Sequence, residues 1–200
     1  MNDVIDLLAG LAPDSPLAMI RDRKPITRQQ AQASHQALFE PADPGDVTAQ
    51  ERFAIASFVA GLHAQDHVTA FYSAGLARTD PSEAFTAALS AEIAQGRTTG
   101  PYGAYPKGPL SAENVPGLIY HVAESHRAAL GAKLAVALEH VHMLVFHPRD
   151  ASAPALQRLL DAGWSNAGIV TLSQLVAFLA FQIRTVAGLR TLAGASGALA

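Results

Sequence analysis

The sequence has 200 residues, of which half are apolar and only 16% are charged, and its net charge at pH 7 is −3. This length suits one domain with a substantial core, and a chain without a basic excess is not expected to bind nucleic acid through its phosphates. There is no cysteine, which excludes disulfides, thiolate metal sites and thiol redox chemistry in this chain.

The hydrophobic pattern is helical from the N-terminus onward, because alanine and leucine dominate and strand-like alternation between turns does not occur. We predict helices at about residues 4–11 and 27–39, and the prolines and glycine of EPADPGD then forbid a helix. Thr48 opens the next helix, predicted to run to Leu76, with Glu51 placed to close a capping box. Thr79 or Asp80 caps a further helix that ends near residue 95.

The second half of the chain begins with one long irregular stretch, residues 96–118, rich in glycine, proline and tyrosine. A long helix is predicted at about 125–146, a short one after Ser152, and a final long one after Ser165. About seven helices result. We therefore predict one all-α domain over residues 1–200, with an N-terminal helical extension (1–45), a core (46–192) and a frayed tail (193–200).

The apolar segment 169–189, IVTLSQLVAFLAFQIRTVAGL, is long enough to suggest a membrane span. It contains Gln174, Gln182 and Arg184, however, and an arginine inside a bilayer is costly. We expect a core or interface helix instead, in a homo-oligomer that covers part of the apolar surface. The acidic N-terminal region lacks the positive charge of a secretory signal, so we expect a cytoplasmic protein without a membrane partner.

The helix opened by Thr48 carries a group of polar residues in its apolar middle. His63 and His67 are four residues apart, and Asp66 is three from His63, so all three share one helix face. They could supply two metal ligands, His63 and His67, or a carboxylate that orients an imidazole for proton transfer. They could equally form a polar stripe facing water or a neighbouring subunit.

Glu51 and His140 also allow two interpretations. Glu51 could act only as a capping residue, or as a partly buried base with a raised pKa. His140 lies on an apolar stripe of its helix, so it points inward either as a core histidine or as a weaker candidate for the site. The sequence has no HExxH, no glycine-rich phosphate loop and no GxSxG element.

Two segments carry a resemblance to a known superfamily. The T-x-x-E-R opening at Thr48, and the segment LLDAGWSNAGIVTLSQLVAFLAFQIRTVAGL, resemble the carboxymuconolactone decarboxylase and alkyl hydroperoxidase D superfamily, over roughly residues 40–192. The chain is most similar to the longer, peroxidase-related members with an N-terminal helical extension. The resemblance implies an AhpD-like all-α domain that assembles into dimers, trimers or hexamers.

The peroxidase members of that superfamily use a motif of the form E-x11-C-x2-C-x3-H, in which two cysteines reduce peroxide and the Glu and His relay protons. Aligned from Glu51, the cysteine positions fall on His63 and Asp66, and the histidine position on Ala70, with His67 three residues earlier. A cysteine-based peroxidase mechanism is therefore excluded. The decarboxylase branch, which moves protons without a redox thiol, gives an acid–base precedent.

Three hypotheses follow. In the first, Glu51, His63, Asp66 and His67, with His140 as a weaker member, perform acid–base or metal-assisted chemistry on a small molecule. The cofactor is open: none, or a transition metal on His63 and His67. In the second, the chain is a non-catalytic structural or regulatory oligomer with a degenerate site. In the third, it binds a small molecule under the loop around Tyr102 and Tyr105. The first requires Glu51 and the two histidines to converge on one enclosed cavity.

Overall fold

The fold is all-α, as predicted. A computed structural model describes residues 3–197, which contain no strand but ten α-helices and two short 3₁₀-helices. The elements are α1 (Val4–Ala9), α2 (Pro16–Asp22), α3 (Pro25–Phe39), α4 (Ala49–Leu62), α5 (Asp66–Ala77), α6 (Glu83–Gly96), η1 (Pro109–Glu113), α7 (Glu124–Leu130), α8 (Ala132–Phe146), η2 (Pro148–Asp150), α9 (Ala153–Asp161) and α10 (Asn166–Gly197).

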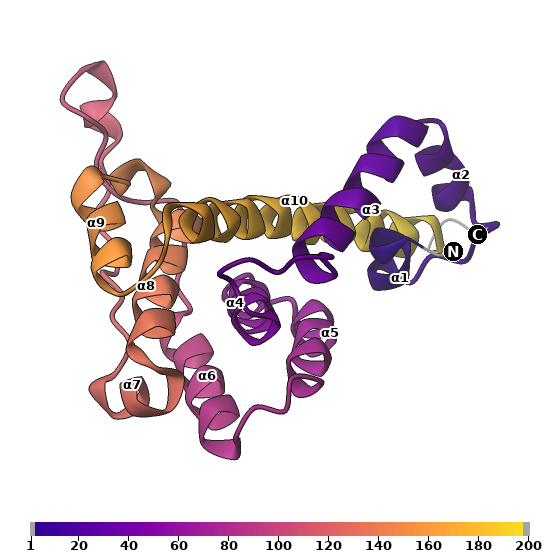
Figure 1. The fold of residues 1–200 in the computed structure, drawn as a ribbon. Helices are drawn as coiled ribbons and strands as arrows, with labels where there is room; N and C mark the ends of the chain where they lie inside the picture. Colours follow the sequence, from indigo (N-terminus) through magenta and orange to yellow (C-terminus); the bar gives the residue numbers. More distant parts are fainter. Residues whose placement is uncertain (1–2, 198–200) are drawn as a thin grey trace.

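Helix α10 runs the length of the molecule, and the other helices are arranged along it (Figure 1). Helices α7–α9 lie at one end of α10 and α1–α3 at the other, while α4–α6 lie along one side (Figure 1). Among residues 3–197, α10 is long and apolar enough to cross a membrane, although 44% of its apolar window is buried within the fold. The bent pair α7–α8 passes the same length and composition test if counted as one span.

Helix α4 forms the centre of the core. Its residues 54–62, AIASFVAGL, are all buried, as expected for a helix that is apolar on every side. It contacts α5, α6, α8 and α10. Close approach depends on two glycines: a Cβ on Gly61 would lie 2.3 Å from Ile93 of α6, and one on Gly75 would lie 2.3 Å from the ring of Phe53.

The predicted helix from Thr48 to Leu76 is wrong, because the structure divides it into α4 and α5. The amide of Gln65 donates to Ala60 O (3.2 Å) and that of Ala64 to Gly61 O (3.0 Å), which is the hydrogen-bond pattern of a Schellman helix end. Ala64 takes the left-handed conformation, with φ 53°, that glycine usually supplies there. Sequence reasoning missed this break because neither glycine nor proline marks it.

The predicted helix at 125–146 is also two helices, α7 and α8, which meet at Gly131 with a bend of 117°. Gly131 has φ 81°, a conformation that ends α7 at no steric cost. Helix α6 begins after Ser82, whose side chain accepts from Phe85 N, and not after Thr79 or Asp80. Helix α2 was not predicted, and α10 continues through 193–197, where a frayed tail was expected; residues 198–200 lie outside the described part.

Candidate functional site

Both carboxylate oxygens of Glu51 are bound by neighbouring side-chain or backbone groups. Its Oε2 accepts from the amide of Thr48 (2.8 Å) and from the Thr48 hydroxyl (3.1 Å), closing the predicted capping box. Its Oε1 pairs with Lys133 Nζ at 2.8 Å. The geometry therefore gives Glu51 a capping role at the start of α4.

His63 lies at the opposite end of α4, about 18 Å from Glu51 by the 1.5 Å rise per residue, and His67 lies in the first turn of α5. The Nε2 atoms of both rings are buried without a hydrogen-bond partner in the described part of the chain. Burial lowers the pKa of both imidazoles, and the charge of Arg184 lowers the pKa of His63 further. These histidines do not share a cavity with Glu51.

Asp66 does not orient either imidazole. Its side chain is 92% exposed at the start of α5 and pairs with Arg97 at 3.5 Å. Within residues 3–197, no group of three or more His, Cys, Asp or Glu side chains is arranged to hold a metal ion. Of the predicted site residues, the structure therefore brings Glu51 together with neither His63 nor His67, and places Asp66 in solvent.

His140 instead lines a pocket that gathers other titratable residues. The pocket has a volume of about 230 Å³ and lies between the end of the long loop, α8, and the turn from η2 into α9. Its buried floor includes His140, Met143 and His147. Its other lining residues are Ile119, Tyr120, His121, Val136, Glu139, Asp150, Ser152, Ala155 and Arg158.

A His–Asp pair forms one wall of this pocket. His147 Nδ1 lies 2.9 Å from Asp150 Oδ2, and Asp150 Oδ1 accepts from the amide of Ala104 at 2.8 Å. The imidazole stacks on Tyr102, with ring centroids 4.9 Å apart, so its orientation is fixed. Because a carboxylate favours a proton on the nitrogen that faces it, Nδ1 carries the hydrogen and Nε2 keeps its lone pair. That nitrogen has no hydrogen-bond partner within the described residues.

The other charged side chains of the pocket, Glu139 and Arg158, differ in the number of their polar partners. Glu139 accepts from Arg127 and from the amide of Val122 (3.1 Å), and His121 Nδ1 lies 3.5 Å away. Arg158 forms no ion pair in the part of the chain that the structure describes. Its charge, after burial as the larger cause, lowers the pKa of His140, which favours the neutral ring.

A fully buried carboxylate, Glu92 of α6, holds the loop side of the pocket. It accepts from the Tyr120 hydroxyl and from the amide of Ala123 (3.0 Å), and His126 Nδ1 lies 2.5 Å from it. Burial and the bond to Glu92 raise the pKa of Tyr120, which stays protonated. Tyr120 in turn stacks on His142 at 4.7 Å. Tyr120 of the pocket wall and the adjoining segment up to Ala123 are thus tied to α6.

Sequence reasoning missed Glu92, Tyr120, Asp150 and Arg158 as members of a site. The HPRD element carries the one local signal, because His147 and Asp150 are three residues apart and bond to each other. In the sequence, its proline marks only the end of the helix predicted at about 125–146. The remaining members come from separate segments, and no spacing in the sequence relates them.

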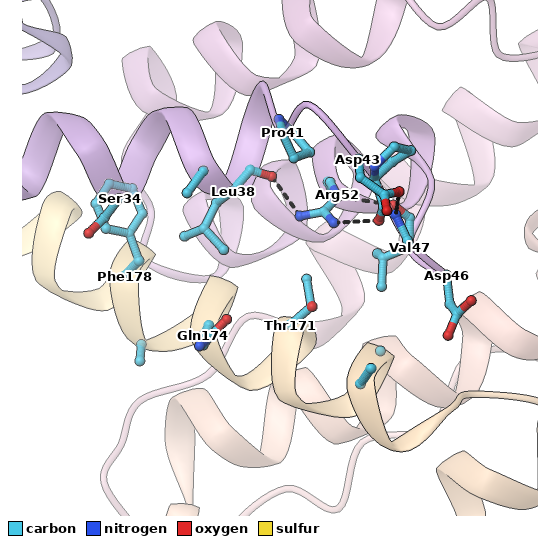
Figure 2. Close-up of a pocket in the computed structure, with 16 residues that line it drawn as sticks. Ser34, Leu38, Pro41, Asp43, Asp46, Val47, Arg52, Thr171, Gln174 and Phe178 are labelled. Atoms are coloured by element: carbon cyan, nitrogen blue, oxygen red, sulfur yellow. Dashed lines mark hydrogen bonds between the residues drawn. The ribbon is translucent and has the colours of Figure 1, made fainter.

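A second pocket, of about 580 Å³, lies between α3, the segment 41–47 and α10 (Figure 2). Arg52 lies at its wall and donates to Leu38 O (2.8 Å), Val47 O (3.0 Å) and Pro44 O (2.9 Å). These bonds tie the segment to the end of α3, so Arg52 has a structural role here. The pocket contains no paired acid and base.

Comparison with known proteins adds no functional information, since no family model, curated protein or solved structure matches the chain.

Proposed function

We propose that the protein is an enzyme that moves protons on a small anionic molecule, without a thiol, in the pocket beside His147. The observation that supports this is the His147–Asp150 pair, with Nδ1 and Oδ2 2.9 Å apart and both residues lining the pocket. A fixed imidazole whose tautomer is set by a carboxylate can act as a general base.

In the proposed step, His147 Nε2 removes a proton from an acidic C–H bond of the substrate. The C–H electron pair stays on the substrate as an enolate, and the imidazolium holds the proton beside Asp150. After the imidazolium exchanges its proton with water, the same nitrogen returns a proton to carbon. The neutral His140 can donate a hydrogen bond to the enolate oxygen, and Arg158 can bind a carboxylate of the substrate.

The size of the pocket limits the substrate. A cavity of about 150 Å³ accepts benzene, so the 230 Å³ pocket suits a molecule of about nine non-hydrogen atoms. The unpaired guanidinium of Arg158 favours a substrate that carries an anionic group. Small oxo acids and carboxylated lactones meet both conditions.

This proposal keeps the acid–base chemistry implied by the resemblance to the carboxymuconolactone decarboxylase superfamily, and it places that chemistry at other residues. A second candidate function is a non-catalytic member whose site is degenerate at the superfamily's motif positions. The bonds of Glu51 favour it, because Thr48 and Lys133 bind the two carboxylate oxygens. The first candidate requires His147 for turnover, whereas the second predicts no turnover.

Exchange of substrate protons with solvent deuterium tests the proposal. A panel of 2-oxo acids and carboxylated lactones is incubated with protein in D2O, and C–H loss is followed by NMR against a protein-free blank. We expect exchange that falls about 100-fold or more in His147→Gln and Asp150→Asn. His63→Gln, outside the pocket, is the matched control and should exchange like the wild type. No exchange with any panel member, or an equal loss in the control, would overturn the proposal.

A further inference from the structure

Helix α10 exposes one continuous face along most of its length. The exposed positions are spaced alternately four and three residues apart: Val170, Gln174, Ala177, Phe181, Arg184 and Gly188. Two are large apolar side chains, with Val170 56% and Phe181 44% exposed. An average spacing of 3.5 residues is the repeat that lets two helices pack along a shared seam.

The seam is complementary to itself in one orientation. With a two-fold axis beside Leu179, an antiparallel second copy sets Phe181 opposite Ala177 and Val170 opposite Gly188, so each large side chain meets a small one. Arg184 then faces Gln174, whose amide oxygen can accept from the guanidinium. A parallel pair would instead place Phe181 opposite Phe181 and Arg184 opposite Arg184. The two aromatic rings would then clash, and the two guanidinium charges would repel each other.

We infer that this seam, Val170 to Gly188 of α10, binds a second copy of the chain in an antiparallel arrangement. The seam is about 27 Å long, and a helix 10–12 Å wide buries about 600 Å² in total along it. A specific interface needs about 1,000 Å², so the flanking surface must also contribute.

The flank is the groove between α3 and α10 (Figure 2). Gln174 and Ala177 belong both to the seam and to the wall of this groove, and Ser34 and Ala37 of α3 form the facing wall. A second helix on the seam therefore contacts α3 as well as α10. The groove explains how the contact area exceeds that of two isolated helices.

The inference is independent of the proposed function, because no seam residue lines the pocket beside His147. Either can fail without the other. Light scattering coupled to gel filtration should find a dimer for the wild type. Phe181→Asp should weaken dimerisation at least about tenfold, and Leu156→Asp on α9, a leucine equally exposed at 44%, should not. Circular dichroism confirms that both variants fold.

Because the chain lacks cysteine, single Cys variants can be spin-labelled without background. In the antiparallel register, copies labelled at Thr185 and at Thr191 are separated along the axis by about 18 Å and 36 Å, whereas a parallel pair gives two equal short distances. A wild-type monomer, two equal distances, or equal behaviour of Phe181→Asp and Leu156→Asp would overturn the inference. A monomer that binds neutral phosphatidylcholine vesicles would assign the face to lipid instead.

Discussion

Acidification from pH 7.5 to 5 should destabilise the fold through His142 of α8. This imidazole is fully buried, its Nε2 donates to Gly96 O at 2.9 Å, and its Nδ1 is buried without a partner among residues 3–197. A proton on Nδ1 would be an unsolvated charge against the Tyr120 ring. Burial chiefly, and then the neighbouring His147, lower the pKa of His142 to about 4, against the raising effect of the bond to Gly96.

The sign and size of the effect follow from linkage. The unfolded chain binds this proton with a pKa of about 6.5, and the folded chain with a pKa of about 4. Stability from the neutral ring is complete above pH 6.5 and is lost as the pH falls from 6.5 towards 4. At pH 5 the unfolded state is almost fully protonated at this site and the native state is not, so His142 costs about 2 kcal/mol of unfolding free energy there.

Urea unfolding followed by circular dichroism at pH 7.5 and pH 5, at one protein concentration, measures this loss. His142→Gln is the matched variant, because its amide can still donate to Gly96 O but does not titrate. The wild type should lose about 2 kcal/mol more than the variant between the two pH values. Burial also lowers the pKa of His35 and His140, and their contributions cancel in the difference. Equal losses in both proteins would refute the reasoning.

Three further predictions concern stability, each measured by urea unfolding at pH 7.5. Glu51→Gln should cost about 1 kcal/mol, because it weakens the capping box and the pair with Lys133; a larger cost would mean that Glu51 does more than cap α4. Arg52→Lys should cost about 3 kcal/mol, since one ammonium cannot replace a planar fork that reaches three carbonyls; a neutral result would contradict this account. Ala64→Gly should stabilise by about 0.5–1 kcal/mol by relieving its φ of 53°, whereas the control Ala60→Gly inside α4 should destabilise by about 1 kcal/mol; destabilisation at both sites would show that the turn conformation is different.

The helical class and many helix ends could be predicted from the sequence because their causes are local. Thr48 with Glu51, and Ser165 bonding to Gly168 N at 3.0 Å, form the caps that their spacing indicates. The break at Ala64 could not be predicted, because its Schellman bonds close on a residue that ordinarily continues a helix. After this turn α5 packs against α4, so the reversal accompanies tertiary packing and is not marked by a local preference.

The break at Ala64 also separates residues that the sequence pattern places on one helix face. His63, Asp66 and His67 can share a face only on one uninterrupted helix, and in the structure His63 ends α4 while Asp66 begins α5. Helical spacing can identify only groups whose partners lie within one helix.

The pocket beside His147 is built differently. Glu92 bonds to Tyr120 and His126, which are 28 and 34 residues away in the sequence. Its role at the pocket wall therefore depends on the packing of α6 against the loop and cannot be predicted from sequence spacing. His147 and Asp150 are the exception, because their bond spans a single turn after α8. A His-x-x-Asp element at a helix end, with a proline to stop the helix, is therefore a better sequence signal for an oriented imidazole here than two histidines four apart in an apolar helix.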